Sequence, residues 1–164
     1  MPAPERHASD DLIDSLLGVG PDHPVGVLRR RRPEALRHAE GAYRELVQPA
    51  DPGGLGLAER AALALRVALR EGDAALAAHY RGLRDNAADG ATDADGDDRL
   101  DALLRYADKV AAAPETTTRA DVEALSALGL APRDIVAATQ LIAFVPWQVR
   151  TIAGLRALLQ ETPR

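Results

Sequence analysis

The chain has 164 residues, enough for one domain with a single buried core, and its net charge of −5 argues against a nucleic-acid binder, which needs a basic surface. Aromatic residues make up only 3%, while alanine and leucine dominate, so good helix formers fill the chain and we predict an all-α protein. The absence of cysteine from this chain excludes disulfides, thiolate catalysis and cysteine-ligated metals.

Three helices are predicted in the first part of the chain. Ser9 can cap the first helix, which stops at Gly18. The second helix ends in a run of arginines at 29–32, and the third has Pro33 at its first position and an apolar stripe up to residue 47. Because cations are favoured at helix C-termini, we interpret the arginine run as structural, with an anion or phosphate site as the alternative.

A loop without periodicity follows at 48–56, and then a helix over 57–71 that is apolar around most of its circumference. Such a helix belongs in the centre of a bundle. Gly72 breaks it, and Asp73 is placed to cap the next helix, which extends from residue 74 to about residue 85. The sequence thus predicts a tight corner between two helices.

The second half of the chain begins with residues 86–98, a run of small and acidic residues that we interpret as a flexible acidic loop. Carboxylates are missing from the first and last positions that a calcium loop requires. Further helices are predicted at about 100–110, after a cap at Thr118, and from Pro132 to residue 144. Pro146 either kinks this last helix or begins another that extends to about residue 160.

Hydropathy gives an expectation for location. No stretch approaches the roughly 20 apolar residues of a membrane span. Residues 1–11 also lack the apolar core of a signal peptide. We therefore expect no membrane partner and a cytoplasmic location.

Several segments together resemble one superfamily. Residues 56–68 (GLAERAALALRVA) are similar to the helix before the active-site corner in carboxymuconolactone decarboxylases and alkylhydroperoxidase-D proteins, and residues 70–80 take the place of that family's Cys-x-x-Cys-x-x-x-His. Residues 139–150 resemble its pocket-closing helix, and residues 11–43 resemble the extension of a peroxidase-related branch.

The resemblance implies an AhpD-like bundle of about eight to nine helices in a single domain over 1–164. Its parts would be an N-terminal helical extension at about 9–47 and a core at about 57–161. It also implies a homodimer, trimer or hexamer.

The thiols of the active relatives are absent from this corner. With the family histidine matched to His79, the two cysteine positions fall on Gly72 and Ala75; with Tyr80 in that place, they fall on Asp73 and Leu76. The relay glutamate falls on Arg60 or Ala61, with Glu59 one residue out of register. A thiol peroxidase cycle needs a peroxidatic and a resolving cysteine, so this chain cannot perform one alone.

Acid–base groups remain at the same corner. His79 can donate or accept a proton near neutral pH, and Tyr80 can donate a hydrogen bond, so these two residues and Glu59 are the catalytic candidates. The structural alternative is that His79 packs in the bundle or faces water. Glu59 would then belong, with Arg66, to a solvated or interfacial ion-pair face.

Three residues are candidates for substrate binding. Arg150 can bind a small-molecule carboxylate through two hydrogen bonds, with Trp147 beside it and Arg66 as a further cation. Stacking of Arg150 on the tryptophan at a subunit contact is the alternative. The four histidines share no ligand-like spacing, so we expect neither a metal nor a cofactor.

Two classes of function follow. The decarboxylase branch of the superfamily implies a thiol-free enzyme that acts by acid–base chemistry on a small organic acid. The alternative is a non-catalytic binding or accessory module, in a mixed oligomer with a thiol-bearing paralogue.

Overall fold

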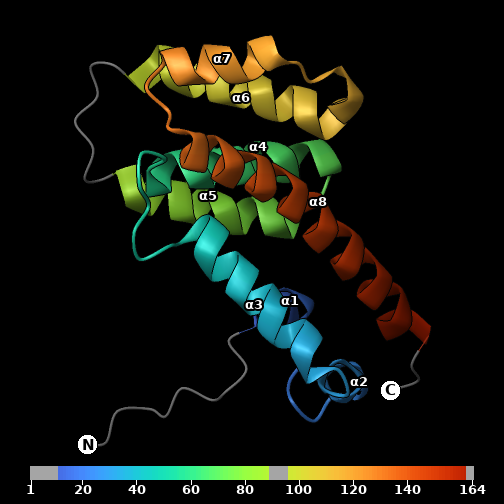
Figure 1. Ribbon diagram of the computed structural model, residues 1–164. Coiled ribbons are helices and arrows are strands. Elements are labelled where there is room, and N and C mark those ends of the chain that lie inside the picture. The colour runs from blue at the N-terminus through green and yellow to red at the C-terminus, as the bar shows by residue number, and fades with distance from the viewer. Residues whose placement is uncertain (1–10, 89–95, 162–164) are drawn as a thin grey trace, which may run out of the picture. The chain divides into compact units, whose positions relative to one another are not determined.

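The computed structural model describes residues 11–88 and 96–161, without the side chains of residues 88, 96, 97 and 161. This part of the chain holds eight α-helices and one 3-10 helix and no strand, which confirms the predicted all-α fold (Figure 1). The helices are α1 (Leu12–Leu17), α2 (Pro24–Arg30), α3 (Pro33–Val47), α4 (Leu57–Glu71), α5 (Ala74–Ala88), α6 (Gly96–Ala112), η1 (Pro114–Thr116), α7 (Arg119–Ala127) and α8 (Pro132–Glu161).

The described residues fall into two compact units. The first contains residues 11–41 and 150–161, and the second contains residues 42–149. Helices α3 and α8 each contribute residues to both units. The single domain over 1–164, with an N-terminal extension at about 9–47 and a core at about 57–161, stays a prediction.

In the first unit, side chains cap the two short helices. The N-cap of α1 is Asp11, whose carboxylate accepts a hydrogen bond from the backbone amide of Asp14 at 2.9 Å. The predicted cap, Ser9, lies outside the described residues. At the end of α2, Arg29 pairs with both aspartates and Arg30 donates to the carbonyl of Pro21. These two arginines lie in the last turn, where the helix dipole favours cations.

In the second unit, α4 is the central helix, as its apolar circumference predicts. It packs against α5 and α6, and α6 packs against α7 (Figure 1). Leu63, Ala64 and Val67 of α4 have no exposed surface. A hydrogen bond of 2.8 Å between Tyr106 and Thr139 joins α6 to the first half of α8. The corner that follows α4 is therefore set on a packed core.

The tight corner between α4 and α5 is confirmed. Gly72 has a φ of 79°, which is a left-handed conformation that glycine adopts without strain, and its amide caps the end of α4. The Asp73 carboxylate accepts a hydrogen bond from the amide of Leu76 at 2.9 Å. Gly72 thus ends α4, and Asp73 caps the start of α5.

The predicted 86–98 loop differs from the structure, and one of the two alternatives for Pro146 is decided. Helix α5 extends to Ala88 and α6 begins at Gly96, so both ends of the predicted 86–98 loop are helical; its centre, 89–95, lies outside the described residues. Pro146 begins no new helix, because α8 continues through it. Only one backbone hydrogen bond depends on the missing amide, and the surrounding turns hold the helix together.

Helix α8 is also more apolar than we expected from the sequence, in which no stretch approached the length of a membrane span. Residues Pro132–Gln160 have the length of a membrane-spanning helix, and an 18-residue window within them has a mean hydropathy of 1.3. Half of that window is buried inside the protein, and the buried side chains of this helix include Asp134 and Gln148. A core helix of a globular protein has the same composition.

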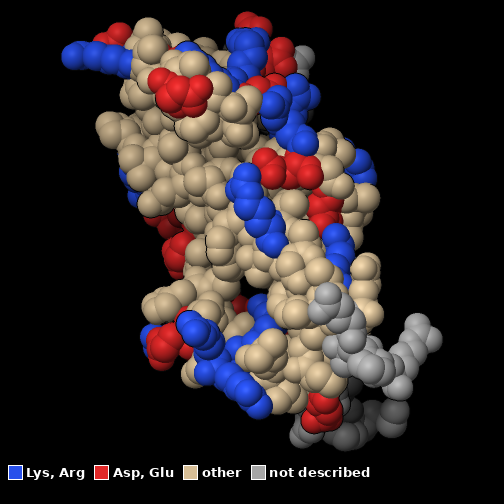
Figure 2. Space-filling model, turned by 90° about the vertical axis from the view of Figure 1, so that its right-hand side faces the viewer, with Lys and Arg blue, Asp and Glu red and all other residues tan. Residues whose placement is uncertain are grey.

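Charged side chains of both signs are interspersed on the face shown in Figure 2. Among the described residues, Arg66 pairs with Asp108 at 2.7 Å and Lys109 with Asp121 at 2.7 Å.

Candidate active site

His79 lies one turn beyond the start of α5 and meets a tyrosine from α3. The hydroxyl oxygen of Tyr43 is 2.7 Å from Nε2 of His79, and the ring centroids are 5.9 Å apart. Both side chains are half-buried. The pair places a phenol and an imidazole in direct hydrogen-bond contact.

Tyr80 follows His79 in the chain but points into the core. It has no exposed surface, and its hydroxyl donates to Oε1 of Gln148 on α8 at 2.5 Å. Its ring meets the His79 ring edge-on, with centroids 5.3 Å apart. The phenol that contacts the imidazole nitrogen is therefore that of Tyr43, while Tyr80 packs behind the histidine.

Burial sets the protonation of these groups. It lowers the pKa of His79, so the imidazole is neutral at pH 7. It raises the pKa of Tyr43 to about 12 and also raises the pKa of Tyr80, which keeps both phenols protonated. A neutral imidazole and a neutral phenol can exchange or donate protons without a charge being buried beforehand.

Glu59 is engaged at the start of its own helix. One carboxylate oxygen accepts from the amide of Gly56 at 2.9 Å, which is a capping interaction. The other receives Nε of Arg99 at 2.6 Å. Both oxygens of this candidate thus serve to fix the start of α4 and to join it to α6.

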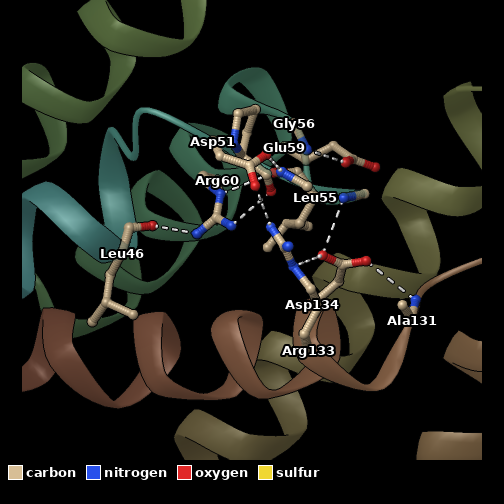
Figure 3. Close-up of polar contacts among 12 residues, drawn as sticks. Leu46, Asp51, Leu55, Gly56, Glu59, Arg60, Ala131, Arg133 and Asp134 are labelled. Atoms are coloured by element: carbon tan, nitrogen blue, oxygen red, sulfur yellow. Dashed lines mark hydrogen bonds and ion pairs between the residues drawn. The ribbon is translucent and has the colours of Figure 1, made fainter.

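Arg60 is buried, with 3% of its surface exposed, and it binds the loop before α4 (Figure 3). Its guanidinium donates to the carbonyls of Leu46, Pro52 and Leu55 at 2.8, 3.0 and 2.9 Å. Burial lowers its pKa. Arg60, a cation that binds backbone carbonyls, thus occupies one of the two positions where the resemblance places the relay glutamate.

Asp134 holds the same loop from the start of α8. Its carboxylate accepts from the amides of Gly54 at 3.1 Å and Ala131 at 3.2 Å (Figure 3). A Cβ added at Gly54 would lie 2.5 Å from this carboxylate, so any larger residue there would have to displace Asp134. The loop from residue 48 to residue 56 is therefore fixed from two helices.

The substrate-binding candidates come from α4 and α8. Arg66 is exposed and binds Asp108 through two hydrogen bonds of 2.9 and 2.7 Å. Trp147 is 43% exposed and stacks on Phe144, with centroids 5.4 Å apart. Arg150 is exposed and belongs to the first unit.

The corner also distinguishes the two alignments of the missing thiols. A cysteine at Gly72 would have to adopt a positive φ, which is strained for any residue with a Cβ. Asp73 and Leu76 carry buried side chains with ordinary backbone. The backbone thus accommodates side chains more readily at Asp73 and Leu76, which are the cysteine positions of the alignment that puts Tyr80 in the place of the family histidine.

No cluster of three or more histidine, aspartate or glutamate side chains that could hold a metal occurs in residues 11–88 and 96–161. His23 caps α2, and His38 lies exposed on α3 near Glu34. His7 lies outside the described residues.

Sequence reasoning missed two residues of this site, Tyr43 and Gln148. Tyr43 falls within the predicted helix that begins at Pro33 and has an apolar stripe up to residue 47, and nothing in that pattern sets its hydroxyl apart. Their partners are 36 and 68 positions away in the chain. A polar residue in an otherwise apolar helix face, as Gln148 is in α8, is the signal that could have found the second.

No family model and no curated protein sequence matches the chain. Among solved structures, the fold is similar to that of an uncharacterised peroxidase-related protein from Silicibacter sp. TM1040. The TM-score is 0.55 at 21% sequence identity, over 88% of this chain and 79% of that one. The chain thus has the all-helical fold of a peroxidase-related protein. It holds no cysteine, and therefore no thiol peroxidase pair.

Proposed function

We propose that this chain is a cysteine-less member of the carboxymuconolactone decarboxylase and alkylhydroperoxidase-D superfamily that performs acid–base chemistry on a small organic acid. The observation that carries the proposal is the 2.7 Å contact between Tyr43 and the neutral, half-buried His79. The fold shared with a peroxidase-related protein supports the superfamily assignment. Because fold alone does not carry function, the chemistry rests on the site.

In this proposal the residues have separate roles. His79 donates a proton or hydrogen bond to the oxygen of the substrate, Tyr43 supports it, and the proton lost from the neighbouring carbon passes to solvent water. Tyr80 and Glu59 act indirectly. Tyr80 packs against the imidazole, and Glu59 fixes the start of α4. For the carboxylate of the substrate we propose Arg150, whose guanidinium can bind it through two hydrogen bonds, with Trp147 and Arg66 as further candidates.

The proposal is tested by following proton exchange rather than by guessing one substrate. The chain is incubated in D2O with a panel of small keto acids and unsaturated carboxylic acids, and deuterium uptake next to the carbonyl or carboxylate is measured by NMR. We expect catalysed uptake for at least one class of acid, and its loss in His79→Gln. His38→Gln is the matched control, because the side chain of His38 is 75% exposed.

The second candidate is a non-catalytic binding or accessory module. It is favoured by the engagement of Glu59 and Tyr80 with structural partners, which leaves neither free to act on a substrate. No deuterium uptake with any acid, together with a folded His79→Gln variant, would support this module and overturn the enzyme. A thiol-bearing paralogue that co-purifies with the chain would identify its partner.

We further propose that the chain forms a homodimer, trimer or hexamer and is a soluble cytoplasmic protein. Large apolar side chains remain exposed on two helices of the second unit: Leu69 is 52%, Val136 is 55% and Trp147 is 43% exposed. Association between subunits would cover such side chains.

A further inference from the structure

The hydrogen bond between Tyr43 and His79 can be formed in two ways. Either the phenol donates to Nε2, or Nε2 carries the proton and donates to the phenol oxygen. The choice decides which nitrogen of the histidine is left for a ligand, since the two ring nitrogens of a neutral imidazole have opposite roles. The structure around the pair favours one of the two.

The phenol is the better donor of the two groups, and an imidazole nitrogen is a better acceptor than a phenol oxygen. Among the described residues, Nε2 of His79 is the hydrogen-bond partner found for the Tyr43 hydroxyl. If Nε2 were the donor, the half-buried phenol proton would have no acceptor in that part of the chain, and an unmade buried hydrogen bond is costly.

The other nitrogen of His79, Nδ1, is accessible to solvent. No hydrogen bond to it is found within residues 11–88 and 96–161. Among the same residues, the fully buried side-chain polar atom that lacks a partner is Oγ1 of Thr117. Since Nδ1 is not such an atom, it retains access to solvent, as the half-buried state of the ring allows.

We infer that Tyr43 holds neutral His79 in the tautomer with its proton on Nδ1, so that the site offers a ligand an N–H donor and not a lone pair. This inference rests on the proposed function and names its substrate class: a ligand that presents a carbonyl or carboxylate oxygen to His79. A neutral imidazole in this role stabilises negative charge that develops on the oxygen, without the desolvation cost of an imidazolium. Tyr43 is then a positioning residue.

The tautomer is measured directly on the full chain labelled with 15N-histidine. A long-range 1H–15N correlation spectrum, recorded at a pH above the His79 pKa, distinguishes a protonated from an unprotonated ring nitrogen. His79→Gln assigns the signals. We expect a protonated Nδ1 and an unprotonated Nε2 in the natural chain, and loss of this preference in Tyr43→Phe, which removes only the hydroxyl.

Tyr80→Phe is the matched control, because it removes a hydroxyl that neighbours the same histidine but bonds to Gln148. It should leave the His79 tautomer unchanged. Titration with acetate should shift the Nδ1–H proton signal of the natural chain in a saturable way. A His79 protonated on Nε2 in the natural chain, an unchanged pattern in folded Tyr43→Phe, or an equal change in Tyr80→Phe would overturn the inference.

The two proposals fail separately. Deuterium uptake by a chain whose His79 is protonated on Nε2 overturns this inference and leaves the proposed function standing. An Nδ1–H tautomer without uptake for any acid supports the inference and makes His79 a binding group, against the enzyme. Should Tyr43→Phe not fold, the spectrum of the natural chain decides alone.

Discussion

Arg60 shows how far the role of one residue depends on its surroundings. Arg60 and Arg66 lie on the same helix, yet the first is 3% exposed and binds three backbone carbonyls, while the second is exposed and pairs with Asp108. A buried cation that satisfies carbonyls is costly to remove because the acceptors stay behind unpaired. A surface ion pair contributes little.

We therefore predict that Arg60→Met lowers the free energy of unfolding by about 3 kcal/mol or more, since three acceptors lose a charged donor. Arg66→Met, the matched control on the same helix, should lower it by about 1 kcal/mol or less. Urea unfolding of both variants measures the difference. Equal losses would show that the carbonyl contacts of Arg60 do not hold the loop.

His79 gives a prediction for the pH dependence of stability. Burial lowers its folded-state pKa below the ordinary 6.5, so the unfolded chain takes up this proton first as the pH falls. Above about pH 6.5 the free energy of unfolding does not depend on this histidine. Below that pH it decreases, and the decrease ends when the pH reaches the folded-state pKa. Burial of His79 thus destabilises the fold only in acid.

The measurement is urea unfolding of the natural chain, His79→Gln and His38→Gln between about pH 8 and pH 5. His79→Gln should lose this part of the pH dependence, because glutamine does not titrate. His38→Gln should keep it, since that side chain is 75% exposed. A pH dependence unaltered by His79→Gln would contradict the burial effect.

At the scale of the elements, the corner between α4 and α5 depends on a single left-handed residue. Gly72 has a φ of 79°, whereas Gly82, within α5, has ordinary helical backbone. A Cβ added at either would meet no atom within 4 Å. The two positions therefore differ in backbone conformation and not in available space.

Gly72→Ala should lower the free energy of unfolding by about 1 to 2 kcal/mol, because a side chain is strained at positive φ. Gly82→Ala should raise it by about 0.5 to 1 kcal/mol, because alanine is the better helix former. Thermal unfolding of the two variants tests the opposite signs. A loss in Gly82→Ala as well would mean that α5 is intolerant of a side chain at that position.

At the scale of the whole molecule, the missing thiols give a null prediction. With no cysteine in 164 residues, the chain has neither a peroxidatic nor a resolving thiol. A hydroperoxide-reduction assay with thiol recycling should stay at background. Turnover that scales with the concentration of the chain would contradict the loss of this chemistry.

Self-association gives the second prediction at this scale. We expect sedimentation equilibrium to give a mass two, three or six times 17.4 kDa. Trp147 is the only tryptophan and is 43% exposed in the single chain, so a Trp147 in the contact should shift its fluorescence to longer wavelength as dilution separates the subunits. A concentration-independent mass of one chain would overturn the proposed oligomer.

The sequence by itself determined the helices and the corner. Helix formers, prolines and glycines act within a few residues of chain, so the bounds of α2, α3 and α4 and the cap at Asp73 could be predicted from local chemistry. The same reasoning could not decide whether Pro146 lies inside α8 or begins a new helix, because packing along the helix offsets one missing hydrogen bond.

Only the tertiary structure decided the site. Local pattern placed His79 beside Tyr80, but the phenol that meets its nitrogen is Tyr43, which comes from another helix. It also showed that Arg60 is buried and that the oxygens of Glu59 are engaged. Such contacts join residues far apart in the chain, and the packing that brings them together has no period or spacing by which a single sequence could reveal it.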